Sequence, residues 1–108
     1  MASTVDMAAA KILWSPAAEQ DLRDIWRHFA EIASTEVAGN LLREIARAAD
    51  RIADHPLAWR ERNDLVPGVR SLPIHPYSIF YRIQDDVVEI ARVLHERRDT
   101  GRALRRRR

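Results

Sequence analysis

Hydrophobic residues recur at intervals of three and four along two long stretches of the chain. The first stretch follows Ser15-Pro16, a pair suited to the cap and first turn of a helix, and runs to about residue 33. Ser34 or Thr35 caps the second, which ends at His55 because the residue before a proline disfavours the helical conformation. With only two or three residues between them, the two stretches predict an antiparallel helical hairpin.

Each predicted helix has an apolar stripe and a charged face. The stripe of the first helix consists of Ala18, Leu22, Ile25, Trp26, Phe29, Ile32 and Ala33. The face expected to point to solvent consists of Glu19, Asp21, Arg23, Asp24 and Arg27.

The remaining apolar runs are short and rich in strand-forming residues. Residues 11–14 form one such run before the helices, and residues 69–74, 77–83 and 87–94 form three more after a loop at 56–67. The element order is therefore β-α-α-β-β-β. It predicts an α+β fold in which the helical hairpin packs on a small, mainly antiparallel sheet of about four strands.

The turn at Asp85-Asp86 sets the expected register of the last two strands. A two-residue loop places Arg82 opposite Glu89, whereas a three-residue loop places Tyr81 there. We favour the two-residue loop because it gathers seven apolar residues on one face, with Arg92 as its one charge. These seven are Tyr77, Ile79, Tyr81, Ile83, Val88, Ile90 and Leu94.

The chain of 108 residues is long enough for one domain only. We expect a disordered leader at residues 1–10, a folded domain at 11–100 and a basic tail at 101–108. The sequence has no cysteine, no secretion signal and no run of about 20 apolar residues. These features fit a cytoplasmic protein.

Charge is distributed unevenly. Residues 92–108 carry eight arginines against Glu96 and Asp99, a net charge of +6, so residues 1–91 carry −4. The chain has 17 arginines and a single lysine, Lys11. This bias favours bidentate contacts to carboxylate or phosphate, and equally fits the base composition of the gene.

The candidate chemistry is limited. The four histidines lie 20 or more residues apart, so we expect no metal site, and no cofactor motif or nucleophile elbow is present. What remains is a group of arginines, histidines and tyrosines after residue 68. Such a group can cleave RNA without metal, or can have only structural roles, with Arg82 and Arg92 paired across the sheet. The group consists of Arg70, His75, Tyr77, Tyr81, Arg82, Arg92, His95, Arg97 and Arg98.

An ordered series of segments resembles the RelE/ParE toxin superfamily. The segments are Trp14-Ser15-Pro16-Ala17-Ala18, Asp21-Leu22, Ile25-Trp26, Pro67-Gly68-Val69-Arg70-Ser71-Leu72, Tyr77-Ser78-Ile79-Phe80-Tyr81-Arg82-Ile83, Asp85-Asp86-Val87-Val88-Glu89-Ile90 and Arg92-Val93-Leu94-His95-Glu96-Arg97-Arg98-Asp99. The resemblance covers residues 11 to about 100. It implies the toxin of a type II toxin–antitoxin pair, neutralised by direct binding of a cognate antitoxin.

The superfamily contains RelE-like ribosome-dependent mRNA endonucleases and ParE-like poisons of DNA gyrase. RelE-like toxins use several basic residues and a late Tyr or His, whereas here Lys11 is the only lysine and neither type follows His95. The ending resembles the ParE-like branch, which implies a ParD-like antitoxin, gyrase as target and no chemistry by the toxin itself. The RelE-like alternative would use Arg82, His95 and Arg70, and a second alternative is a nucleic-acid-binding module that uses the terminal arginines.

Two sets of site residues follow. The expected target-binding set consists of Arg70, Arg82, Arg92, His95, Arg97 and Arg98. For the antitoxin we expect contacts at Trp14, Trp26 and Trp59, at least one of them exposed; the alternative is that all three belong to the core.

Overall fold

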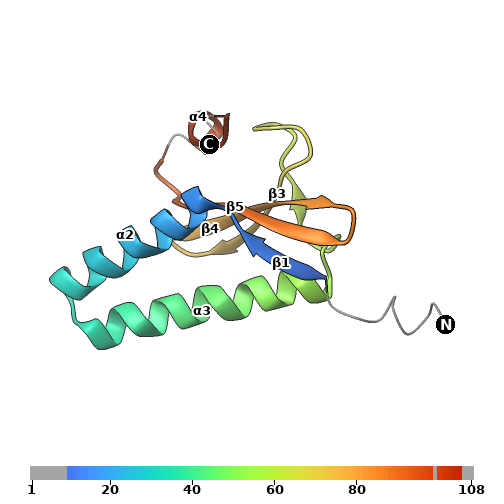
Figure 1. Ribbon diagram of the computed structural model, residues 1–108. Coiled ribbons are helices and arrows are strands. Elements are labelled where there is room, and N and C mark those ends of the chain that lie inside the picture. Colours follow the sequence, from blue (N-terminus) through green and yellow to red (C-terminus); the bar gives the residue numbers. More distant parts are fainter. Residues whose placement is uncertain (1–9, 99, 106–108) are drawn as a thin grey trace.

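The computed structural model describes residues 10–98 and 100–105, which form a five-stranded sheet, two long helices packed on it and a third, short helix. Helices α2 (Pro16–Ile32) and α3 (Thr35–Asp54) run antiparallel and cover one face of the sheet (Figure 1). The predicted α+β architecture is confirmed. No helix in the described part of the chain is long and apolar enough to span a membrane.

Both helices begin at the serines that the sequence indicated. The Ser15 hydroxyl oxygen accepts a hydrogen bond from the Ala18 amide at 3.0 Å, and the Ser34 hydroxyl does the same for Val37 at 3.0 Å. Each cap satisfies an amide that has no partner within its helix. Helix α3 ends at Asp54, with His55 as its cap before Pro56.

The sheet has the order β1-β5-β4-β3-β2. Strand β1 (Lys11–Trp14) pairs in parallel with β5 (Val87–His95), and the remaining pairs, through β4 (Tyr77–Gln84), β3 (Arg70–Ile74) and β2 (Arg60–Glu61), are antiparallel. The fifth strand, β2, lies inside the loop expected at 56–67. Its two residues are exposed, so no alternation of apolar residues marks it, and its pairing with β3 defines it.

The predicted register between β4 and β5 is confirmed near the turn. Arg82 lies opposite Glu89, and Asp85 adopts a positive φ of 56°, which suits a two-residue hairpin turn. A β-bulge then intervenes, because Phe80 pairs with Arg92 while Tyr81 pairs with Ile90. The extra residue, Ala91, reverses which β5 side chains face the helices.

The bulge corrects two expectations about the helix-facing side of β5. Val93, rather than Leu94, joins the core under the helices. Leu94 packs on the opposite face of the sheet with Val69 and Phe80. Arg92 leaves the apolar face and reaches around the free edge of β5 to helix α2.

The basic end of the chain begins with a helix. Helix α4 (Thr100–Arg105) buries Ala103 and Leu104 in the cluster that contains Leu94, on the side of the sheet away from α2 and α3 (Figure 1). This corrects the expected tail at 101–108 for residues 101–105, because two apolar residues among the arginines give the segment a side to bury. Residues 106–108 and nine of the ten leader residues lie outside the described part; Ala10 donates its amide hydrogen to Ala53 O at 3.0 Å.

Candidate functional site

The edge of β5 beyond β1 is closed by side chains of helix α2. Strand β1 ends with Trp14 opposite Ile90, so the next polar groups of β5 lack a neighbouring strand. The Ser15 hydroxyl donates a hydrogen bond to Ala91 O at 2.8 Å, and Asp21 accepts one from the Val93 amide at 2.9 Å. The start of α2 therefore continues the hydrogen bonding of the sheet and is fixed against β5.

Asp21 and Arg92 form a buried ion pair at this edge. Arg92 Nε and Nη2 donate to the two carboxylate oxygens of Asp21, each at 2.8 Å, and the side chains are 16% and 8% exposed. The hydrogen bonds to Asp21 raise the pKa of the Arg92 guanidinium above its usual value. Arg92 Nη1 also donates to Ala103 O at 3.2 Å, so this side chain joins α2, β5 and α4.

The burial of Asp21 corrects its assignment to the solvent face of the first helix. Asp21 lies three residues after Ala18 and four before Ile25, and both neighbours are buried. The helical spacing that identified the apolar stripe therefore also passes through Asp21, and a carboxylate there requires a buried partner.

Arg70 is held by the loop that follows α3. Its Nη1 donates to Trp59 O at 2.7 Å and to Leu57 O at 3.3 Å, and its Nη2 pairs with Glu61 Oε2 at 3.1 Å. Next to it, the buried Tyr81 hydroxyl donates to Pro56 O at 2.6 Å. Burial raises the pKa of Tyr81 to about 12, although the nearby Arg70 charge acts in the opposite direction.

The residues proposed for RNA cleavage do not come together. Tyr81 and Ile83 face the helices, so Arg82 between them points to the other face of the sheet. His95 lies on the helix side against the ring of Tyr77, with ring centroids 5.3 Å apart. His95 pairs with Tyr77 of β4. Tyr77 and Arg82 are five residues apart on this strand, which corresponds to a distance of about 16 Å.

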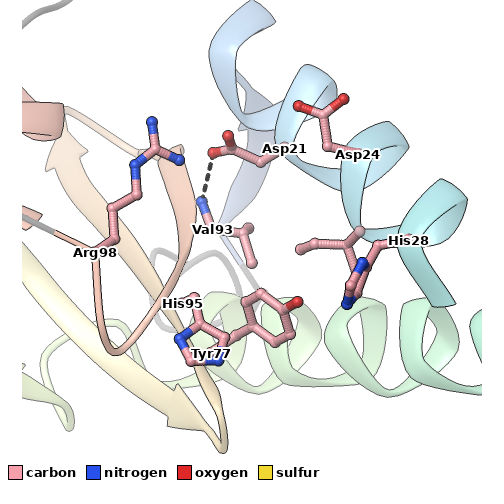
Figure 2. Close-up of a pocket in the computed structure, with 8 residues that line it drawn as sticks. Asp21, Asp24, His28, Tyr77, Val93, His95 and Arg98 are labelled. Atoms are coloured by element: carbon pink, nitrogen blue, oxygen red, sulfur yellow. Dashed lines mark hydrogen bonds between the residues drawn. The ribbon is translucent and has the colours of Figure 1, made fainter. Parts of the chain in front are cut away.

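An open cleft of about 170 Å³ lies between α2 and the ends of β4 and β5. Figure 2 shows the Tyr77 ring beside His95, with its hydroxyl on the side facing α2. Burial raises the pKa of Tyr77. His95 Nδ1 accepts a hydrogen bond from the Arg97 amide at 3.1 Å. The cleft is lined by Asp21, Asp24, Ile25, His28, Tyr77, Val93, His95 and Arg98.

This cleft contains two residues of the predicted target-binding set, His95 and Arg98. Asp24 and His28 also line the cleft and were not predicted, although their helical spacing with Ile25 and Asp21 places them on adjoining positions of α2. Arg97 and Arg98 are exposed in the segment after β5, and neither side chain has an ion pair within residues 10–98 and 100–105. No group of histidines and carboxylates suited to a metal ion occurs among those residues.

The three tryptophans differ in exposure. Trp26 is 39% exposed on α2, which fits the expectation that at least one tryptophan is open to solvent. Trp14 and Trp59 are half-buried and pack against the main core, and the buried Trp59 Nε1 has no hydrogen-bond partner among the residues that the structure describes.

Several known proteins are similar to this chain in sequence or in fold. Residues 12–100 match the family of the ParE toxin of the parDE type II toxin–antitoxin system. Toxin ParE1 of Mycobacterium tuberculosis is 34% identical over 97 residues, which cover 89% of this chain and 99% of the relative. Toxin ParE3 of Caulobacter vibrioides is 31% identical over 84 residues, covering 78% and 84%.

Two solved structures show the same fold. A chain of the chromosomal ParDE toxin–antitoxin system from P. aeruginosa superimposes with a TM-score of 0.73 and 24% identity, covering 81% of this chain and 96% of that one. A chain of the toxin–antitoxin complex RelBE2 from M. tuberculosis gives 0.58 and 22%, covering 82% and 93%. The sequence matches go further than the fold and show that this chain belongs to the ParE family of type II toxins.

Proposed function

We propose that this toxin inhibits DNA gyrase by blocking the resealing of cut DNA, and that a ParD-like antitoxin neutralises it. The separation of Arg82 from His95 supports this reading over RNA cleavage, because they lie on opposite faces of the sheet. A general acid must reach the same phosphate that the arginine stabilises. On this proposal the toxin acts in the cytoplasm.

Within the predicted target-binding set, Arg97 and Arg98 are the residues best suited to contact gyrase. Both are exposed and have no ion pair among the described residues. Arg70 and Arg92 are engaged by Glu61 and Asp21, so their contribution is to hold the fold. A pair of free arginines in a surface turn suits an acidic protein surface or a DNA phosphate.

A supercoiling assay tests the target. Purified toxin added to gyrase and relaxed plasmid should inhibit supercoiling or trap cleaved DNA, and Arg97→Ala/Arg98→Ala should raise the inhibitory concentration at least about tenfold, as expected for two charge-assisted contacts. Translating ribosomes treated with the same toxin should yield uncut mRNA. Cleaved mRNA that depends on Arg82 or His95, with gyrase unaffected, would instead establish the RelE-like alternative.

Trp26 is the tryptophan we assign to the antitoxin interface. A large aromatic side chain with 39% of its surface exposed contributes strongly when a partner buries it. Trp26→Ala should weaken antitoxin binding about tenfold or more, measured by titration calorimetry. The control is Leu57→Ala, which removes a 72% exposed apolar side chain after α3. Equal antitoxin affinities of the Trp26→Ala and Leu57→Ala variants would show that Trp26 does not belong to the interface.

A further inference from the structure

The acidic groups that line the cleft between α2 and β5 are already engaged by the protein. Both Asp21 oxygens accept hydrogen bonds, from Arg92 and from the Val93 amide. Asp24 Oδ1 accepts from Gln20 at 2.9 Å and from Arg27 at 3.3 Å. The acceptor capacity of the cleft is therefore mostly used within the domain.

The hydrogen-bond donors of the same cleft are free. Among the described residues, the Tyr77 hydroxyl, the His28 ring and the Arg98 guanidinium have no hydrogen-bond partner, although all three line the cleft (Figure 2). His95 accepts the Arg97 amide at Nδ1, which leaves the ring proton on Nε2 as a further donor. The cleft is thus lined by up to four donors and by the buried side chains of Ile25 and Val93, with the Arg98 guanidinium extended toward Asp21 and away from Tyr77 and His28 (Figure 2).

The size of the cleft limits what these donors can bind. Its volume of about 170 Å³ is well below the roughly 300 Å³ at which small-molecule pockets begin, and it suits a single side chain. The Asp24 carboxylate, 59% exposed at the same cleft, repels a doubly charged phosphate monoester more strongly than a singly charged carboxylate, whereas a nucleic-acid phosphodiester carries the same single charge as the carboxylate.

We propose that the cleft binds the carboxylate of an acidic side chain of the antitoxin at Tyr77 and the two histidines, and that the exposed Arg98 side chain turns from the rim of the cleft onto the bound carboxylate. This inference rests on the antitoxin partner of the proposed function. It gives neutralisation a physical basis: Arg98 belongs to the turn proposed to contact gyrase, so a carboxylate seated on it removes that arginine from the target. The buried side chains of Ile25 and Val93 accommodate the methylene groups of the same side chain.

The first experiment uses a small carboxylate probe on the full chain. N-acetylglutamate amide, with its side-chain carboxylate, is titrated into ¹⁵N-labelled toxin, and N-acetylglutamine amide and inorganic phosphate are run beside it. We expect saturable shifts of the Val93, His95 and Arg98 amides with the glutamate probe only. Arg98→Gln should weaken this binding about tenfold, and Tyr77→Phe, which keeps the ring, about threefold or more.

Arg97→Gln is the matched control, since Arg97 is exposed next to Arg98 but does not line the cleft. It should change probe affinity less than twofold. Equal losses for Arg97→Gln and Arg98→Gln, no saturable carboxylate binding, or tighter binding of phosphate would overturn the proposal, the last by indicating a phosphate group as occupant. Circular dichroism of each variant verifies the fold.

A second measurement separates this inference from the proposed target. The affinity of the antitoxin for Tyr77→Phe and Arg98→Gln should fall in the same order as that of the probe. Gyrase inhibition is measured on the unaltered toxin. If the unaltered toxin fails to inhibit gyrase while antitoxin affinity falls in the variants, the target is wrong and the cleft assignment stands. Undiminished antitoxin affinity in both variants refutes the cleft assignment alone.

Discussion

Replacement of Asp21 by alanine should destabilise this toxin more than any change at the exposed carboxylates of α2. The substitution strands the Arg92 guanidinium, whose side chain is 16% exposed, and also removes the acceptor of the Val93 amide. Breaking a buried ion pair on one side costs about 3–5 kcal/mol. A domain of this size has a total stability of about 5–15 kcal/mol, so a large fraction is lost.

The assay is urea unfolding at pH 7, followed by tryptophan fluorescence, with m-values compared to verify that both variants unfold as the same unit. Asp24→Ala is the matched control, three residues further along α2. Its ion pair with Arg27 has side chains 59% and 63% exposed, so the loss should be about 0.5 kcal/mol or less.

A double variant isolates the stranded charge. Asp21→Ala/Arg92→Met removes the guanidinium but keeps an apolar stem of similar length, so it should be more stable than Asp21→Ala alone. It should still be less stable than the natural sequence, because Val93 keeps an unpaired amide and Ala103 O loses its donor. Equal costs for Asp21→Ala and Asp24→Ala would refute the assignment of Asp21 and Arg92 as the link between α2, β5 and α4.

Two further predictions concern stability. The pKa of Tyr81 rises from its usual 10.0 to about 12 in the folded state. The neutral Tyr81 side chain therefore contributes fully to the free energy of unfolding below pH 10, and this contribution is lost as the pH rises to about 12. That loss amounts to about 3 kcal/mol; Tyr81→Phe should flatten the decline in unfolding free energy over this range, and parallel curves would contradict it. Leu104→Ala should cost about 2 kcal/mol in urea unfolding if α4 is docked through this buried residue, whereas a change below about 0.5 kcal/mol would indicate the solvated tail that composition suggests.

Local signals in the sequence were sufficient for the helices and for most strands. Ser15, Pro16 and Ser34 act within one helical turn, and the change from a period of three or four to a period of two marks where the sheet begins. The register at Arg82 and Glu89 follows from a two-residue loop, which the grouping of apolar residues on one face favoured.

The β-bulge and α4 depend on contacts between distant residues. The bulge that exchanges Val93 for Leu94 lies where β1 ends and α2 takes over the edge of β5, more than 70 residues earlier in the chain. Helix α4 has only Ala103 and Leu104 among its arginines as apolar anchors, and the site they fill is formed by Val69, Phe80 and Leu94. No short window of the sequence contains both Asp21 and Val93, or both Val69 and Leu104.

Residue type alone also does not distinguish arginines that hold the fold together from arginines that are exposed to a partner. Arg70 and Arg92 have the same composition-based case for target binding as Arg97 and Arg98, but each of the first two has a carboxylate partner placed by the fold, Glu61 for one and Asp21 for the other. Because Asp21 neutralises Arg92 beside the cleft, Arg98 in the turn that follows β5 remains a cation there without an ion pair among the described residues. The same buried pair that fixes α2 against the sheet thus leaves the charge on Arg98 available to a partner.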